Sequence, residues 1–180
     1  KGTSTYHINS CETIEIFYHL RTDLDKLKYA VHMNKIIQEV TEENENCYRI
    51  LQLYLNTLYM ISETEKNLDF IISVFKIKLL CILGFKPMVN KCTNCGDTKN
   101  ITHFSIKDNG VKCKECYTQD KGSIKISKST LTALNYIVFS PCKKIFNFNL
   151  KDEALRELNL LSKVYFNEKL EKEYKLEEIF

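Results

Sequence analysis

Four cysteines near the middle of the chain have the spacing of metal ligands. They form two Cys-x-x-Cys pairs, Cys92–Cys95 and Cys113–Cys116, with 17 residues between the pairs. Two residues between thiolates allow a tight turn to aim both sulfurs at one metal, and two such turns complete a tetrahedron with sulfur about 2.3 Å from zinc. The arrangement is typical of a structural zinc site. Because sulfur fills all four positions, no position is left for a catalytic water, and we predict one structural Zn²⁺ per chain.

Other chemistry fits these cysteines less well. Disulfides need an oxidising compartment, which nothing in the sequence suggests, and a redox pair is expected once, beside a βαβ pattern. An iron–sulfur centre also uses four cysteines, but paired turns favour zinc. His103 lies between the pairs as an alternative ligand, although four cysteines suffice. The remaining cysteines are expected to be mostly small buried hydrophobic residues: Cys11, Cys47, Cys81 and Cys142.

The segment between the two pairs has the pattern of a short hairpin. Gly96 follows the first pair directly, where such a turn commonly needs a positive φ. Residues 101–106 have the composition of a strand, and Asp108-Asn109-Gly110 is a turn sequence that leads back to the second pair. We therefore predict a zinc ribbon over residues 88–125.

Positive charge is concentrated in the same region. Residues 1–85 carry a net charge of −2, residues 86–128 carry +5, and residues 129–180 carry zero. Four thiolates on one Zn²⁺ would leave roughly +3 on this segment. A lysine-rich surface is often no more than a soluble surface, but it also allows an anionic partner. The lysines that could meet such a partner, and its phosphates if the partner is the DNA that the family resemblance described below implies, are Lys86, Lys91, Lys99, Lys107, Lys112, Lys114, Lys121 and Lys125.

No constellation of residues indicates catalysis. The sequence contains no P-loop, dinucleotide-binding, metalloprotease or serine-hydrolase motif. His7, His19 and His32 are spaced by 12 and 13 residues, which is not ligand spacing on a helix, so surface or core roles explain them better. We expect a protein that is not an enzyme. Uncharged apolar runs are also too short for a transmembrane helix.

The rest of the chain has helical periodicity. Apolar residues recur every three or four positions from Glu12 to Leu83, with a loop at 42–46. Ser62-Glu63-Thr64-Glu65 resembles a capping box and predicts that a new helix starts there. That helix should stop at Gly84 and Pro87. After the ribbon, we predict a helix capped by Ser127 or Ser129 and broken at Pro141, a helix over about 151–166, and a further short helix toward residue 179.

These patterns predict a mainly α protein, a helical bundle interrupted by a small four-cysteine zinc ribbon. Its parts are an extended segment at 1–11, a first helical part at 12–87, the ribbon at 88–125, and a second helical part at 126–180. Thr3–Ile8 favours an extended strand, which cannot be stable alone.

Several of these segments together resemble the RecO family of recombination mediators. In that family a long apolar helix ends in Leu-Gly-aromatic-x-Pro and leads directly to a Cys-x-x-Cys-Gly turn. The matching stretches here are VFKIKLL at 74–80, LGFKP at 83–87, KCTNCG at 91–96 and GVKCKEC at 110–116. The segment YHINSCETIE at 6–15 and the Ile126-Ser127 start of the following helix are also similar, so the resemblance covers nearly the whole chain.

The resemblance implies functions that composition and spacing do not. RecO proteins begin with an OB-fold, so we expect residues 1–11 to be the exit from such a domain. The family binds single- and double-stranded DNA, anneals strands, and helps RecR load RecA onto strands coated by the single-stranded-DNA-binding protein SSB. We therefore expect a cytoplasmic, nucleoid-associated protein that acts in DNA repair and recombination.

The family also docks the acidic, Phe-ending tail of SSB in its helical domain. A cation beside an apolar cleft would suit such a tail. The residues that we expect to form it are Phe75, Lys76, Lys78 and Leu79. The alternative for the whole chain is a zinc-ribbon adaptor that makes only protein–protein contacts.

Overall fold

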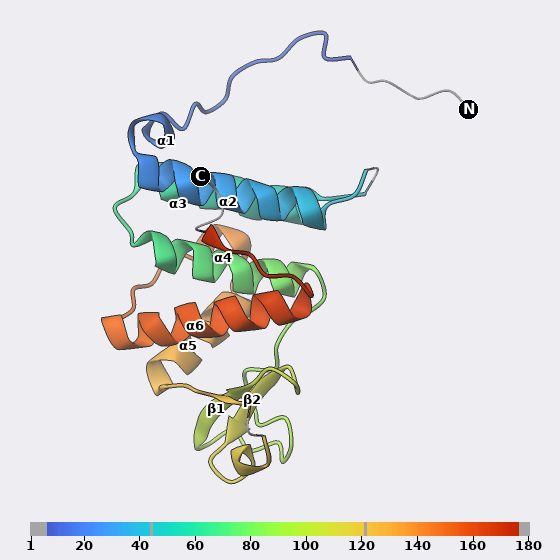
Figure 1. Cartoon of the computed structure of the whole chain (residues 1–180), viewed down its shortest axis with the longest axis vertical. Helices are drawn as coiled ribbons and strands as arrows, with labels where there is room; N and C mark the ends of the chain where they lie inside the picture. The colour runs from blue at the N-terminus through green and yellow to red at the C-terminus, as the bar shows by residue number, and fades with distance from the viewer. Residues whose placement is uncertain (1–6, 44, 121, 177–180) are drawn as a thin grey trace, which may run out of the picture.

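The computed structural model describes residues 7–43, 45–120 and 122–176. It is a helical bundle with a small three-stranded ribbon at one end (Figure 1). In chain order its elements are α1 (His19–Thr22), α2 (Leu24–Val40), α3 (Tyr48–Glu63), α4 (Leu68–Ile82), β1 (Ile101–Ser105), β2 (Gly110–Cys113), the 3₁₀ turn η1 (Tyr117–Gln119), β3 (Ile124–Lys125), α5 (Lys128–Phe139), the 3₁₀ turn η2 (Cys142–Lys144) and α6 (Asp152–Lys169). The predicted fold class is confirmed. Within the described ranges, no helix has the length and apolar character needed to cross a membrane.

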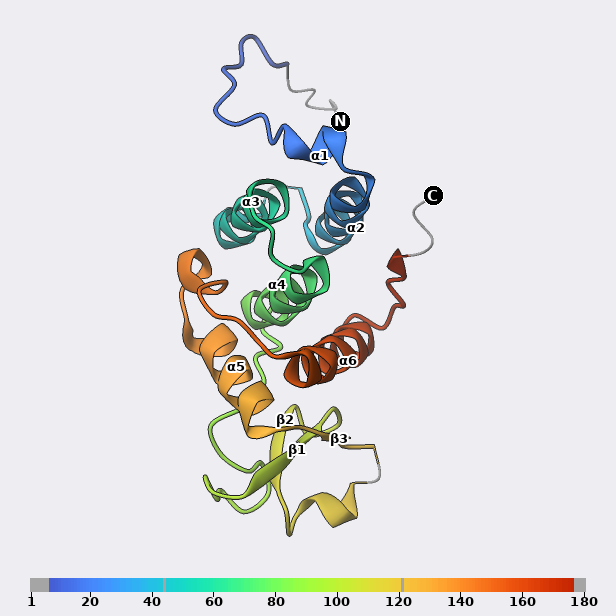
Figure 2. The ribbon, with the colours of Figure 1, turned by 90° about the vertical axis from the view of Figure 1, so that its left-hand side faces the viewer.

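Helix α4 is the centre of the bundle. Eleven of its 15 residues are buried, and because most of these are apolar and lie on all sides of the helix, other helices must enclose it. Helices α2 and α3 pack on one side of it, and α5 and α6 pack on the other (Figures 1 and 2). Of the helices that pack on α4, two therefore precede it in the chain and two follow it.

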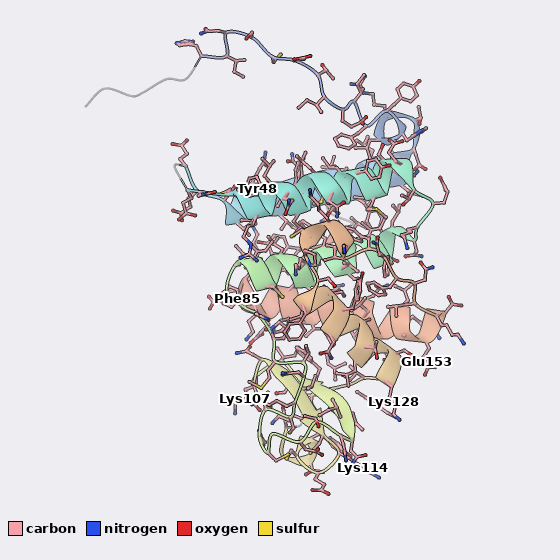
Figure 3. All side chains as sticks on the ribbon, turned by 180° about the vertical axis from the view of Figure 1, so that it is seen from behind. Tyr48, Phe85, Lys107, Lys114, Lys128 and Glu153 are labelled. Carbon is pink, nitrogen blue, oxygen red and sulfur yellow. The ribbon has the colours of Figure 1, made fainter. Side chains whose placement is uncertain are left out.

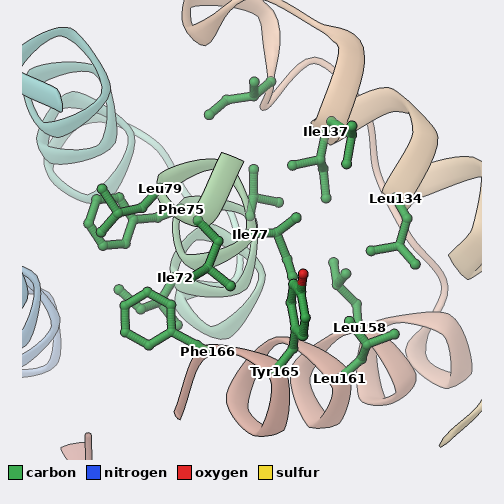
Figure 4. Packing of buried hydrophobic residues seen from close by; sticks show 14 of the residues in the cluster. Ile72, Phe75, Ile77, Leu79, Leu134, Ile137, Leu158, Leu161, Tyr165 and Phe166 are labelled. Atoms are coloured by element: carbon green, nitrogen blue, oxygen red, sulfur yellow. The ribbon is translucent and has the colours of Figure 1, made fainter. Parts of the chain in front are cut away.

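The side chains of α4 divide between these two layers. Ile77 points toward Ile137 of α5 and Tyr165 of α6, whereas Leu79 lies on the side of α4 that faces α3 (Figure 4). All four residues are buried, and full burial of a side chain of this size contributes about 1.5–3 kcal/mol. The core is thus continuous through α4 from one layer to the other.

The first helix differs from the prediction. Residues 7–16 contain no helix or strand, and α1 is a single turn that begins at His19. Phe17 has a φ of +50°, which a helix does not tolerate, and Asp23 then caps α2 by accepting hydrogen bonds from the N–H groups of Asp25 and Lys26. The predicted strand at Thr3–Ile8 lies largely outside the described residues.

The predicted start of α4 is also wrong. Helix α3 continues through Ser62 to Glu63, so Ser62 is a buried helical residue and not a cap. The cap of α4 is Asn67, whose Oδ1 accepts a hydrogen bond from the N–H of Phe70 at 3.0 Å. Other predicted boundaries are confirmed: Ser127 caps α5, and α4 ends before Gly84. No helix forms over 171–175, and the end of the predicted last helix lies outside the described residues.

The ribbon is a sheet with strand order β2-β1-β3, in which both pairings are antiparallel. Gly110 begins β2 beside Met88, with Val111 donating a hydrogen bond to the Met88 carbonyl at 2.9 Å. A Cβ on Gly110 would lie 2.5 Å from that carbonyl oxygen, so the close approach requires glycine.

The ribbon packs directly on the bundle. Phe104 of β1 meets Tyr165 of α6 edge to face with ring centroids 5.1 Å apart. The Tyr165 hydroxyl donates a hydrogen bond to the Phe85 carbonyl at 3.0 Å, and Asn135 of α5 donates one to the Val89 carbonyl at 3.1 Å. These contacts hold the ribbon in one orientation against α5 and α6. That residues 88–125 form a domain of their own stays a prediction.

The cap of α4 can be tested by substitution. Asn67→Ala should lower the free energy of unfolding by about 1 kcal/mol, because the Phe70 N–H loses its partner. Glu65→Ala should cost only a few tenths of a kcal/mol, since the Glu65 side chain is 96% exposed and pairs only with Lys26 at 3.5 Å. Urea unfolding followed by circular dichroism measures both. A larger loss of unfolding free energy for Glu65→Ala than for Asn67→Ala would instead support the predicted capping box at Ser62–Glu65.

Candidate metal centre and basic surface

The four predicted cysteines converge at the end of the ribbon away from the helices. Their sulfur atoms all lie within 4.8 Å of one another. The Sγ atoms of Cys95 and Cys113 are 3.7 Å apart, and a tetrahedron with zinc–sulfur bonds of about 2.3 Å has edges of about 3.8 Å. The four sulfurs therefore fit a metal ion of this size.

Backbone geometry shapes the first pair. The Gly96 N–H donates to the Cys92 carbonyl at 3.0 Å, and the Cys92 N–H donates to the Asp97 carbonyl at 2.7 Å. Gly96 has a φ of +76°, the left-handed conformation expected at this position. The N–H of Thr93 donates to the Val111 carbonyl, which ties this turn to β2 and so to the second pair.

The electrostatics of the four thiols favour a cation. Burial alone would raise the pKa of the Cys92 thiol, but the backbone N–H groups of Cys95, Cys113 and Asn94 lower that pKa to about 6. In contrast, hydrogen bonds with the sulfurs of Cys113 and Cys95 raise the pKa of Cys116 to about 12. One thiolate is thus favoured by the backbone, whereas four together need a bound cation. These residues are suited to hold a structural zinc ion.

The alternative ligand and the other cysteines lie elsewhere. His103 is not part of the cysteine cluster; its ring stacks on Tyr117 with centroids 3.8 Å apart. Of the cysteines expected to be buried, Cys142 is buried, Cys47 and Cys81 are half-buried, and Cys11 is exposed.

Most of the predicted ribbon lysines are exposed. Lys107 lies on the side of the ribbon near the bundle, and Lys114 lies near its far end (Figure 3). The Nζ of Lys86, at the junction, lies 4.4 Å from the centroid of the Phe139 ring. The other exposed members are Lys91, Lys99 and Lys125, and Lys121 lies outside the described residues.

Lys112 differs from the other members of this set. It is 3% exposed, and its Nζ lies 2.5 Å from Asp108 and 4.0 Å from Asp120. The hydrogen bond with Asp108 raises the pKa of Lys112, so the pair stays ionised. Lys112 is therefore an internal ion-pair partner in this structure and is not placed to meet a phosphate. The sequence offered one sign of this, since Asp108 lies four residues before it.

The four residues expected at an SSB-tail cleft do not form a common surface. Phe75 and Leu79 are fully buried in α4. The Nζ of Lys78 donates to carbonyls at the C-terminal end of α5, including Ile137 at 3.1 Å, whereas Lys76 borders a cavity beside α2 and α6. The cleft expected from α4 is absent in this arrangement because helices enclose α4 on both sides. Tail binding by these residues stays a prediction.

Removing one sulfur tests the metal centre. Cys113→Ser should reduce bound zinc well below one ion per chain, because the tetrahedron loses a buried ligand. Protease cleavage should then increase within residues 88–125, while the helical circular dichroism signal is largely kept. Elemental analysis and limited proteolysis measure the two effects.

Cys47→Ser is the matched control, because Cys47 lies outside the cluster and precedes α3. It should bind zinc like the parent chain. Equal zinc content and equal protection in Cys113→Ser would contradict the four-cysteine site.

Comparison with known proteins places this architecture in a family. The family model described as "Recombination protein O C terminal" matches residues 21–178. A "DNA repair protein RecO" from Acetivibrio thermocellus is 43% identical over 175 residues, which cover 97% of this chain and 70% of that protein. The corresponding protein of Alkaliphilus metalliredigens is 34% identical, covering 92% of this chain and 68% of its own length.

The similarity extends to more distant relatives. The "DNA repair protein RecO" of Bacillus subtilis is 28% identical over 149 residues, which cover 83% of this chain and 58% of that protein. The family match includes both the helices and the cysteine ribbon between them. The chain belongs to the RecO family.

Proposed function

We propose that this chain acts in DNA repair and recombination as a mediator module that binds DNA through its ribbon and catalyses no reaction. Family membership supports the biological role, since the curated relatives carry the name DNA repair protein RecO. The structural observation that carries the DNA contact is the group of exposed lysines on the ribbon: Lys91, Lys99, Lys107, Lys114 and Lys125. A metal ion held by the four cysteines would stabilise the strands and turns that carry these lysines.

The proposed contact is electrostatic. The exposed lysines project from different strands and turns, and Lys107 and Lys114 lie toward opposite ends of the ribbon (Figure 3). This spread suits a phosphate backbone better than a single base edge, because phosphate contacts position a strand without reading its sequence. We expect binding to single- and double-stranded DNA with little sequence preference and a strong dependence on salt.

The same proposal includes the mediator's partners. Loading of RecA with RecR, strand annealing, and contact with the SSB tail rest on the family resemblance. A location at the nucleoid follows from DNA binding. The residues of α4 named for the SSB tail would have to present their side chains differently from the present packing.

Charge reversal tests the DNA contact. The combined change of Lys91, Lys99, Lys107 and Lys114 to Glu should abolish binding to a fluorescent single-stranded oligonucleotide at moderate salt. Each phosphate contact contributes about 0.7 to the slope of log affinity against log salt. Reversal of a single lysine should reduce the magnitude of that slope by up to about 0.7, as measured by fluorescence anisotropy at several salt concentrations.

Reversal of Lys35 on α2 and Lys151 before α6 is the control, because both lysines are exposed and lie outside the ribbon. It should leave DNA binding nearly unchanged. Equal loss in the control would show a non-specific charge effect. If the ribbon variant keeps its DNA affinity but no longer binds RecR or SSB, the protein-only adaptor is the better description.

A further inference from the structure

A polar cavity lies in the bundle, apart from the ribbon. It has a volume of about 200 Å³ and is bordered by α2, α4, α6 and the segment 171–176. Among the side chains that line it are His32, Asp69, Ser73, Lys76 and Lys163. Its position between helices that are distant in sequence explains why no motif marked it.

Two basic side chains reach this cavity without a polar partner. His32 is 3% exposed and Lys76 is 7% exposed. Among the described residues, neither side chain makes a hydrogen bond or an ion pair; the Nζ of Lys76 only faces the ring of Phe166, 5.6 Å from its centroid. Burial of a polar group without a partner is costly. The side-chain nitrogens of His32 and Lys76 are nevertheless not fully enclosed. In the described part of the chain, Thr93 Oγ1 is the only fully enclosed side-chain nitrogen or oxygen that lacks a hydrogen-bond partner.

Lys78 shows how the same helix satisfies a buried lysine. Its Nζ donates to the carbonyls of Val138 at 3.3 Å and Ser140 at 2.5 Å, in addition to that of Ile137. Those carbonyls lie at the negative C-terminal end of α5. Lys76, two residues earlier, has no corresponding set of acceptors, and it is one of the residues that line the cavity.

The charges around the cavity are predominantly positive. Burial, together with nearby Lys163, lowers the pKa of Lys76 to about 8. Burial and the charge of Lys76 lower the pKa of His32 to about 4, so its imidazole is neutral near pH 7 and offers one N–H donor. Asp69 is the acidic side chain of the lining, and it already accepts a hydrogen bond from the Tyr29 hydroxyl.

We propose that this cavity is a binding site for the carboxylate or phosphate group of a small ligand, with Lys76 and His32 as the principal donors. An oxyanion would supply the acceptors that both side chains lack, and it would offset the repulsion between Lys76 and Lys163. Ser73, whose Oγ lies 2.7 Å from the Asn159 amide, stands beside Lys76 on the cavity wall. The volume suits a small ligand group and excludes a folded partner. The site is independent of the DNA contact proposed for the ribbon.

Acetate and inorganic phosphate are the probes, each compared with chloride at the same ionic strength. In ¹H–¹⁵N spectra of the 180-residue chain, at least one of them should shift amides of α2, α4 and α6 that border the cavity, with saturation in the millimolar range. The probe whose titration saturates shows whether the site takes a carboxylate or a phosphate. If neither probe differs from chloride, or if the shifts are confined to the ribbon, the proposal is overturned.

Lys76→Met removes the charge and keeps the length of the side chain. This variant should melt at the same or a higher temperature than the parent chain without anion, because an unpaired buried ammonium has been removed. Its affinity for the anion should fall at least tenfold. A lysine with a purely structural role would instead lower the melting temperature when replaced, and unchanged anion affinity would overturn the proposal.

Two further variants keep the test decisive if Lys76→Met fails to fold. Lys163→Gln changes an exposed residue at the rim and should weaken anion binding two- to threefold. Lys128→Gln, on an exposed lysine of α5 outside the cavity, should leave binding unchanged. Equal effects of these two variants would count against the site.

The binding should also depend on pH. As pH rises through about 8, Lys76 loses its proton and acetate, which stays ionised, should bind more weakly. The ionisable groups facing Lys76 are Tyr29 and His32 from α2, Asp69 from α4, Lys163 from α6, and Tyr174 and Lys175 from the last segment. Burial raises the pKa of both tyrosines, to about 12 for Tyr174, so they remain neutral in this range. Constant acetate affinity from pH 7 to 9 would contradict the role of Lys76.

Discussion

Complete burial of α4 is the constraint on which the other elements depend. A helix with large apolar side chains on all sides is unstable in water until both of its sides are covered. The helices that cover one side, α2 and α3, precede it in the chain, whereas α5 and α6 follow only after the ribbon. The ribbon is thus an insertion between a core helix and the helices that complete its enclosure. Its two ends, at Met88 and Ile126, are held near each other by the bundle itself, through the Val89–Asn135 hydrogen bond and the burial of Ile126.

This placement gives a very small sheet two independent supports. A unit of fewer than about 40 residues usually buries too little surface to be stable without a metal or another support. One support is the bundle, since Phe104 packs on Tyr165 and the Tyr165 hydroxyl binds the Phe85 carbonyl where the chain leaves α4. The other is the four-sulfur cluster at the opposite end, where a metal would join the turn after Val89 to the end of β2. Loss of the metal would therefore release the far end first, while the strand residues nearest the helices kept their apolar contacts.

The sequence predicted features that depend on local spacing and missed those that depend on distant partners. The cysteine spacing, the strand at 101–106 and the end of α4 each come from residues close together in the chain, and the structure contains all three. The capping box at Ser62 failed although it is also local, because α3 buries Ser62 against the core and Asn67 provides an equally good cap five residues later. Lys112 and Lys76 are different cases, because lysine is usually a surface residue. Only the fold shows that Lys112 pairs with Asp108 and Asp120 and that Lys76 lines a cavity.

The burial of Lys112 also changes the distribution of charge that the ribbon presents to an anionic partner. Composition alone counts Lys112 as an available cation and Asp108 and Asp120 as charges that oppose DNA binding. In the fold Lys112 pairs with both carboxylates, so the three groups together carry a net charge of −1, and the Asp120 side chain is only 13% exposed because Ser105 and Lys112 hold it against the sheet. The exposed lysines are then opposed mainly by Asp97, Glu115 and the negative charge of a four-thiolate metal centre. Because the cysteine cluster lies toward one end of the ribbon, its charge falls off across the sheet, and lysines distant from the sulfurs, such as Lys107 on the side near the bundle, should attract phosphate more strongly than those beside the cluster.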